Sequence, residues 1–94
     1  MKTIHLHLES IKTKEELHNI FKQELGLAGH YGENLDALYD CLMELYAPVK
    51  IVIFSKFPAE LPLGNYARQL VTMLQEAADE NMAIRLSLLE QEGK

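Results

Sequence analysis

Acidic side chains dominate one stretch of this 94-residue chain, and their spacing suggests recognition of positive charge. No lysine or arginine occurs between Gln23 and Val49. Five acids occupy the same interval: Glu24, Glu33, Asp36, Asp40 and Glu44. Asp36, Asp40 and Glu44 recur every four residues, which places them on one face of a helix. An ordinary exposed helix face mixes its acids with bases four residues away, so this face is suited to meeting a basic partner.

The helix that would carry these acids has two contrasting arcs when its residues are placed 100° apart. The apolar arc contains Leu35, Leu38, Cys41, Leu42 and Leu45. The opposite arc contains the three acids together with Tyr39 and Met43, which we expect to be exposed. Exposed apolar atoms among uncompensated like charges cost stability, so a binding role is favoured. A solvated acidic helix without a partner is the alternative.

A glycine-rich loop, GLAGHYGE at residues 26–33, precedes this helix and has His30 and Tyr31 at its tip. Three glycines in eight residues indicate a loop. Loops held beside a rigid helix often carry function, which makes both side chains candidate contacts. From the residues alone, Tyr31 is equally compatible with a place in the core and a place in an interface.

The overall charge disfavours one class of partner and favours another. Nine lysines and arginines stand against fourteen acids, which gives a net charge of −5. A nucleic-acid binder needs a basic surface to displace counterions, whereas an acidic protein attracts basic ones. We therefore expect a basic protein partner and no nucleic acid.

Length and cysteine content predict one domain, residues 1–94, in a reducing compartment. Cys41 is the only cysteine, so no internal disulfide can form. No apolar run approaches the roughly 20 residues of a membrane helix, and the first ten residues alternate instead of forming a signal-peptide core. The expected location is the cytoplasm, away from any membrane.

Two elements are predicted before the acidic helix. Residues 3–8 alternate strictly between apolar and polar types, which indicates a strand with one buried face. Thr13 and Glu16 have the spacing of a capping box, in which each side chain bonds the other residue's backbone N–H. They predict the start of a helix that Gly26 ends.

The acidic helix itself is expected over residues 35–46. Asn34 is a favourable residue for its N-cap, and Pro48 closes it. Residues 49–54, VKIVIF, are nearly all apolar, which suits a strand covered on both sides.

The last part of the chain predicts a third main helix and a final strand. Asn65 should cap the helix, over residues 66–80, and Asn81 can take the left-handed conformation at its end. Residues 83–89 alternate again. Strands separated by helices indicate an α/β fold with a parallel sheet. Because the strand at 49–54 is the most apolar, it should lie centrally, giving a two-layer fold with strand order 1-2-3.

Residues 30–42, HYGENLDALYDCL, resemble the recognition loop and helix of the barstar family of ribonuclease inhibitors. A weaker similarity extends over nearly the whole chain. The resemblance implies a three-stranded parallel sheet, order 1-2-3, packed against helices. It also implies an inhibitor without a cofactor, whose loop and second helix enter the active-site cleft of a secreted barnase-type ribonuclease and protect the cell that makes it.

The family's contact residues are carried over position by position. Asp40 matches the carboxylate that takes the place of the substrate phosphate, facing the nuclease's arginines and catalytic histidine, and Asp36 matches a second acidic contact. Glu76, on the exposed side of the third helix, matches a distant acidic contact, and Cys41 matches a structural cysteine. The expected partner-binding set is His30, Tyr31, Gly32, Asn34, Asp36, Tyr39, Asp40, Met43, Glu44 and Glu76.

Several positions depart from the best-known members of the family. His30 replaces a tyrosine and Tyr39 a tryptophan, while Met43 and Leu45 replace a threonine and another tryptophan. Met82 occupies the position of a second cysteine. These departures leave the phosphate-mimicking carboxylate in place but bear on which nuclease is bound.

The sequence also contains residues that could support catalysis or metal binding. Asp36 and Asp40 could be catalytic or metal-binding carboxylates, but both lie on one helix, and a hard cation needs oxygens from other elements as well. His5 and His7 form an HxH pair that would need a third ligand, from His18 or His30, to hold zinc.

Two further alternatives concern the thiol and the partner. Cys41 lies on the apolar arc, where thiols are inert. A module of the same fold could bind a basic protein other than a ribonuclease. We expect no catalytic residue and no metal, and a 1:1 complex with the nuclease.

Overall fold

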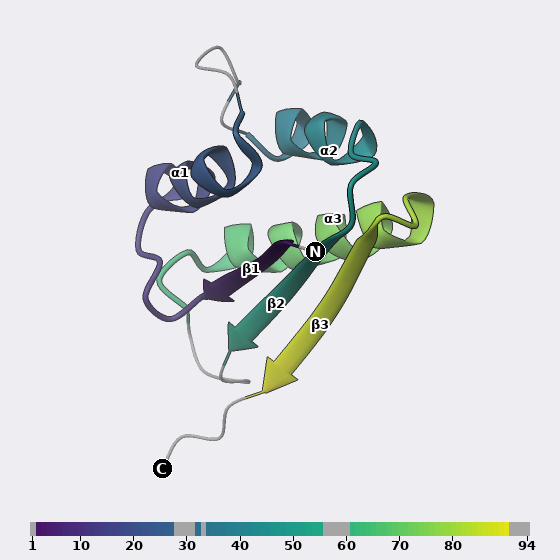
Figure 1. Ribbon diagram of the computed structural model, residues 1–94. Helices are drawn as coiled ribbons and strands as arrows, with labels where there is room; N and C mark the ends of the chain where they lie inside the picture. Colours follow the sequence, from purple (N-terminus) through teal and green to yellow (C-terminus); the bar gives the residue numbers. More distant parts are fainter. Residues whose placement is uncertain (1, 28–31, 33, 56–60, 91–94) are drawn as a thin grey trace.

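The computed structural model describes residues 2–27, 32, 34–55 and 61–90 (Figure 1). In chain order the elements are β1 (Lys2–His7), α1 (Lys14–Leu25), α2 (Leu35–Met43), β2 (Val49–Ser55), α3 (Asn65–Glu80) and β3 (Ile84–Glu90). The three strands are parallel, in the order β1-β2-β3. The predicted α/β class, the parallel sheet and the central place of the most apolar strand are confirmed.

The core lies on one face of the sheet. In the aligned strands Ile4, Ile51 and Leu86 are neighbours, and they point to the same side. The buried residues of all three helices join that side in one cluster. In Figure 1 the sheet lies in front and α3 passes behind it. The helices therefore form one layer and the sheet the other, with the acidic α2 in the helical layer.

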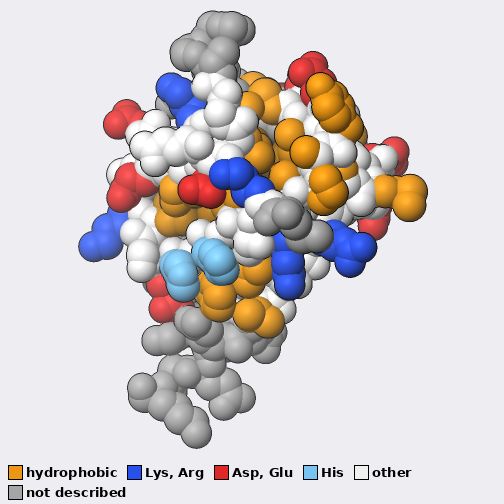
Figure 2. Space-filling model, in the orientation of Figure 1, with side chains coloured by type: hydrophobic (Ala, Val, Ile, Leu, Met, Phe, Trp, Pro, Cys, Tyr) orange, Lys and Arg blue, Asp and Glu red, His pale blue; other side chains and the backbone are white. Residues whose placement is uncertain are grey.

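In the part of the chain that the structure describes, no helix covers the second face of the sheet, so the prediction that residues 49–54 are covered on both sides is wrong. Lys50 and Phe54 point outward from β2 and are only half-buried, while Val52 between them is 8% exposed. Neighbouring side chains provide the cover, because the His7 ring stacks on Phe54 with 4.4 Å between the centroids. Figure 2 looks onto this face, where the exposed histidines of β1 appear in pale blue.

Helix α1 begins and ends as predicted. The Glu16 backbone N–H donates to Thr13 Oγ1 at 3.0 Å, and the Thr13 N–H donates to Glu16 Oε1 at 3.0 Å. Gly26 ends the helix with a φ of 64°, a left-handed conformation that glycine adopts at little cost. Leu17 and Phe21 are fully buried against the core. The capping box thus fixes where the first helix starts, and the apolar spacing of its side chains sets the face that it buries.

A buried histidine links α1 to α3. His18 is fully buried, and its Nε2 lies 2.6 Å from the hydroxyl oxygen of Tyr66. This pair is in the helical layer, whereas His5 and His7 are exposed on the outer face of the sheet. His18 therefore cannot complete a zinc site with them. Burial raises the pKa of the Tyr66 hydroxyl, which keeps it protonated beside the imidazole.

Both asparagines expected to bound α3 act differently from the prediction. Gly64, with a φ of 55°, is the N-cap, and Asn65 is the first helical residue. The chain enters through a tight turn in which the Tyr66 N–H donates to the Leu63 carbonyl at 3.1 Å, so backbone groups replace a side-chain cap. At the other end Asn81 is extended, with a φ of −126°.

None of the helices in the described part of the chain combines the length and apolar character that crossing a membrane requires.

We expect Thr13→Ala to lower the free energy of unfolding by about 1 kcal/mol, because the Glu16 N–H loses its acceptor. Urea unfolding measures this loss. Ser10→Ala is the control, since exposed Ser10 contributes a backbone hydrogen bond that alanine retains, and it should shift the value by less than about 0.5 kcal/mol. Equal stability of the two variants would contradict a working capping box.

Candidate functional site

The N-terminal end of α2 is fixed by local hydrogen bonds. Asn34 Oδ1 accepts from the Ala37 N–H at 2.7 Å, which confirms Asn34 as the N-cap. Its amide nitrogen donates to the Gly32 carbonyl at 3.3 Å and so ties the end of the loop to the helix. A Cβ at Gly32 would lie 3.2 Å from Ala37 Cβ, which is closer than ordinary contact. Glycine is therefore favoured at residue 32 because the loop approaches the first turn closely.

The C-terminal end of α2 comes earlier than predicted. The helix ends at Met43 with Glu44 as C-cap, so the expected extension to residue 46 is wrong. The Leu45 N–H donates to the Leu42 carbonyl at 3.2 Å in a tighter turn. The carbonyls of Leu42 and Leu45 also accept hydrogen bonds of 2.9 Å from the Asn81 side chain. The Asn81 side chain thus satisfies carbonyls at the C-terminal end of α2, which lies well before Pro48.

The acids of α2 face solvent, as their spacing predicts. Asp36, Asp40 and Glu44 are all exposed, on the side opposite Leu38 and Leu42, which are fully buried. No described lysine or arginine forms an ion pair with any of the three. In this arrangement each acid lies one turn from the next, so their mutual repulsion is uncompensated within the described residues.

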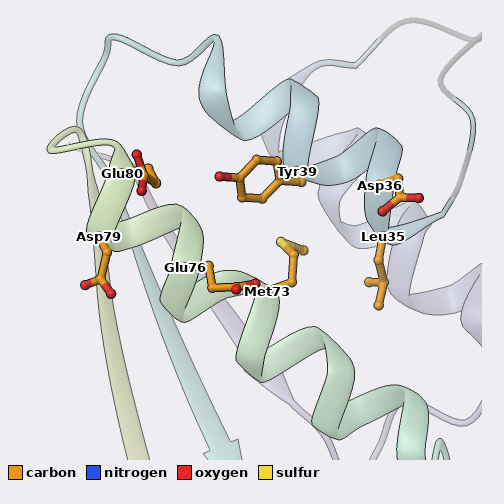
Figure 3. Close-up of a pocket in the computed structure, with 7 residues that line it drawn as sticks. All are labelled: Leu35, Asp36, Tyr39, Met73, Glu76, Asp79 and Glu80. Carbon is orange, nitrogen blue, oxygen red and sulfur yellow. The ribbon is translucent and has the colours of Figure 1, made fainter.

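The two apolar residues among these acids are less exposed than predicted. Tyr39 and Met43 are half-buried and pack against the core cluster. Helix α3 packs beside α2 and covers part of the side of α2 that the sequence predicts to be exposed. In Figure 3 the Tyr39 ring projects from α2 into the gap beside Met73. Tyr39 therefore contributes to packing while it also lines the surface that the acids share.

A groove between α2 and α3 has four acidic residues among those that line it (Figure 3). Its lining residues are Leu35, Asp36 and Tyr39 from α2 and Met73, Glu76, Asp79 and Glu80 from α3. The structure thus places Glu76, expected to be a distant acidic position, on the same groove as Asp36. Asp40 does not line the groove but is exposed on the same helix, one turn beyond Asp36. Acidic residues of both helices therefore line one groove, and Asp40 adds a further exposed acid on α2.

Sequence reasoning missed Asp79 and Glu80. They follow Glu76 by three and four residues and so share its face of α3. Both are exposed, whereas Ala77, which follows Glu76 in the sequence, is fully buried. The helical-arc argument that identified the acids of α2 would have found them had it been applied to the outer side of α3.

The Cys41 thiol is held in its protonated form. Burial raises its pKa, and the carboxylates of Glu44 and Asp40 add to this effect. A thiolate is the nucleophilic form of cysteine, so the surroundings of Cys41 oppose a catalytic role. They agree with its half-buried place beside the core.

The arrangement can neutralise cationic groups of a partner. Carboxylates accept charge-assisted hydrogen bonds, which are strongest when an arginine binds both oxygens.

No group of three or more histidine, cysteine, aspartate or glutamate side chains within the described residues has the geometry of a metal site. His30 and Tyr31 lie outside the described residues, so the structure does not place these two loop positions relative to the groove.

Comparison with known proteins links this geometry to a family. The sequence model of the family described as Barstar (barnase inhibitor) matches residues 1–91. A protein of Bacillus subtilis (strain 168) named "Putative ribonuclease inhibitor YrdF" is 37% identical over 67 residues, which are 70% of this chain and 74% of that protein. The family match covers all six elements and both helices that line the groove.

Removing the charge of Asp40 should stabilise the fold slightly. Asp40→Asn keeps the side-chain shape and relieves repulsion with Asp36 and Glu44, for a gain of roughly 0.3 kcal/mol. The melting temperature should therefore rise at low salt, and the rise should fade near 1 M salt, where the screening length is about 3 Å.

Glu15→Gln provides the matched control for that measurement. Glu15 lies in the first turn of α1, near the positive end of the helix dipole. Its neutralisation should lower the melting temperature under the same conditions. A melting temperature that falls in Asp40→Asn would refute the repulsion between the acids of α2.

Proposed function

The chain belongs to the barstar family, and we propose that it inhibits a basic, secreted ribonuclease of the barnase type by blocking the active site with the acidic face of α2. The observation that carries the proposal is the row of exposed acids without described basic partners, on a helix fixed at both ends. Such a surface is complementary to a nuclease cleft, which concentrates positive charge to hold phosphate.

Asp40 is the proposed mimic of the phosphate. Its two carboxylate oxygens can take the positions of phosphate oxygens and accept paired hydrogen bonds from an arginine. The backbone of α2 is already ordered before binding, so little conformational entropy is lost when the complex forms. Inhibition in this mechanism is steric and electrostatic, and it needs no bond to be made or broken.

The remaining contacts surround Asp40 in the proposal. Asp36 and Glu76 would take further cations of the nuclease, with Tyr39 providing apolar contact in the groove between them. Gly32 and Asn34 shape the approach of the loop to α2, and Met43 and Glu44 lie at the end of the contact surface. His30 and Tyr31 remain predicted contacts at the tip of the loop.

The biological setting follows from the same proposal. An inhibitor of a secreted nuclease protects the producing cell when it is present in the cytoplasm before the nuclease leaves. One inhibitor would occupy one active site, so the proposed stoichiometry is 1:1. A basic protein other than a ribonuclease could meet the same acidic face, and RNA cleavage assays separate these two partners.

The first test of the proposal is a titration of RNA cleavage by a barnase-type nuclease. The wild-type protein should abolish cleavage at one equivalent. Asp40→Ala should weaken the complex most, by about 2–5 kcal/mol, because it leaves nuclease cations buried and unpaired. Asp36→Ala and Tyr31→Ala should follow, and then Tyr39→Ala and Glu76→Ala.

Glu15→Ala is the control for charge alone in this series. It removes one negative charge from an exposed position on α1 and should inhibit almost as well as wild type. Wild-type inhibition by Asp40→Ala would rule out the phosphate-mimic mechanism. If the wild-type protein leaves RNA cleavage by every candidate nuclease unchanged, the inhibitor function itself is ruled out.

The rate of association should depend steeply on salt. Opposite charges on the two proteins accelerate their encounter, and ions screen that attraction. Stopped-flow mixing at increasing ionic strength should show a falling association rate constant and a dissociation rate constant that changes much less. An association rate that is independent of salt would exclude electrostatic steering by the acidic face.

A further inference from the structure

Asn81 connects three elements through its side chain. It lies between the end of α3 and the start of β3, where its amide nitrogen donates to the carbonyls of Leu42 and Leu45, each at 2.9 Å. Its side-chain oxygen accepts from the Ala83 N–H at 2.9 Å. An asparagine side chain has two N–H donors, and the end of α2 accounts for both. Both donors of the Asn81 amide are therefore committed to the end of α2.

The end of α2 needs such donors because its electrostatics are unfavourable. The C-terminus of a helix carries partial negative charge, and carboxylates near it are destabilising. Asp40 lies in the last turn of α2 and Glu44 is the C-cap, while the last turn contains no basic residue. Lysine or arginine can compensate a helix C-terminus, but a cation here would neutralise part of the acidic face. Asn81 provides N–H groups to the carbonyls without adding charge.

We propose that Asn81 is the positioning residue of the inhibitory helix. It fixes the C-terminal turn of α2 against the junction of α3 and β3, and so sets the direction in which Asp40 projects. A binding group must be held within about 0.5 Å of its productive position, and Asp40 is only two residues from the Leu42 carbonyl that Asn81 holds. The inference rests on the proposed ribonuclease inhibition, which it deepens by assigning a role to a residue outside the contact surface.

The test compares Asn81→Ala with the wild-type protein in complex with a barnase-type ribonuclease. The variant keeps every carboxylate, so the association rate constant should stay within about twofold of wild type. The dissociation rate constant should rise about tenfold, because Asp40 no longer has a fixed direction. Asn81→Ser, which retains an acceptor for the Ala83 N–H but can donate only one hydrogen bond and adds no charge, should also dissociate faster and serves if the alanine variant does not fold.

Thr13→Ala separates positioning from loss of stability. It removes a cap of α1 and lowers stability without touching α2, so it should dissociate from the nuclease at the wild-type rate. A second measurement combines Asn81→Ala with Asp40→Ala. If Asn81 acts through Asp40, its effect on dissociation should largely disappear in this background. Equal dissociation rate constants for Thr13→Ala and Asn81→Ala would overturn the proposal. Fully additive effects of Asn81→Ala and Asp40→Ala on dissociation would overturn it as well.

Amide hydrogen exchange tests the positioning without any nuclease. In the free protein, Asn81→Ala should accelerate exchange at Glu44 and Leu45 and leave Leu17 and Phe21 of α1 unchanged. Unchanged exchange at the end of α2 would overturn the role of Asn81 even if inhibition is observed. Accelerated exchange in a protein that inhibits no ribonuclease would instead overturn the proposed function, and with it the inhibitory part of this inference.

Discussion

A helix whose exposed side carries only carboxylates has to be held by contacts that bring no positive charge to it, and the surroundings of α2 satisfy that condition. Leu38 and Leu42 fix it to the core by burial alone. Asn34 caps its first turn, and Asn81 donates to its last carbonyls. Neutral amides therefore bind the backbone at both ends of the helix: Asn34 is a favoured N-cap, and Asn81 donates to the carbonyls at the C-terminal end, where a basic residue would also be favourable.

The other elements provide the platform for this helix. The aligned parallel strands offer one apolar face, on which the buried residues of all three helices meet in a single cluster. Because α3 packs beside α2 on that face, its outward acids extend the acidic surface beyond the second helix. The capping box at Thr13 and the buried pair of His18 and Tyr66 hold α1 in the same layer. The helical layer thus packs its apolar side chains on the sheet, and the acids of α2 and α3 lie on its solvent-facing side.

Local periodicity predicted most of the fold, and long-range contacts account for the errors. The alternation in β1, the capping box of α1 and the Asn34 cap depend on residues within four positions, and all are confirmed. The left-handed conformation predicted for Asn81 is wrong, because its side-chain partners lie 36 and 39 residues away and could not be seen in the local sequence. The open face of the sheet and the burial of Tyr39 likewise depend on where helices pack in space. Of the candidate site, the acids of α2 could be found from spacing, whereas the groove formed with α3 could not.

The separation of roles along α2 has a consequence for how such a protein can diverge. Asp36, Asp40 and Glu44 are exposed, so in the proposed inhibitor mutations there can alter partner choice while the fold is retained. Tyr39 is different, because it packs against the core and lines the groove as well. In the proposed inhibitor, a mutation at that position would change folding and recognition together, and compensating mutations would be expected at Met73 on the facing helix. New partner specificities should therefore evolve first through the acids, with Tyr39 and Met73 changing as a pair.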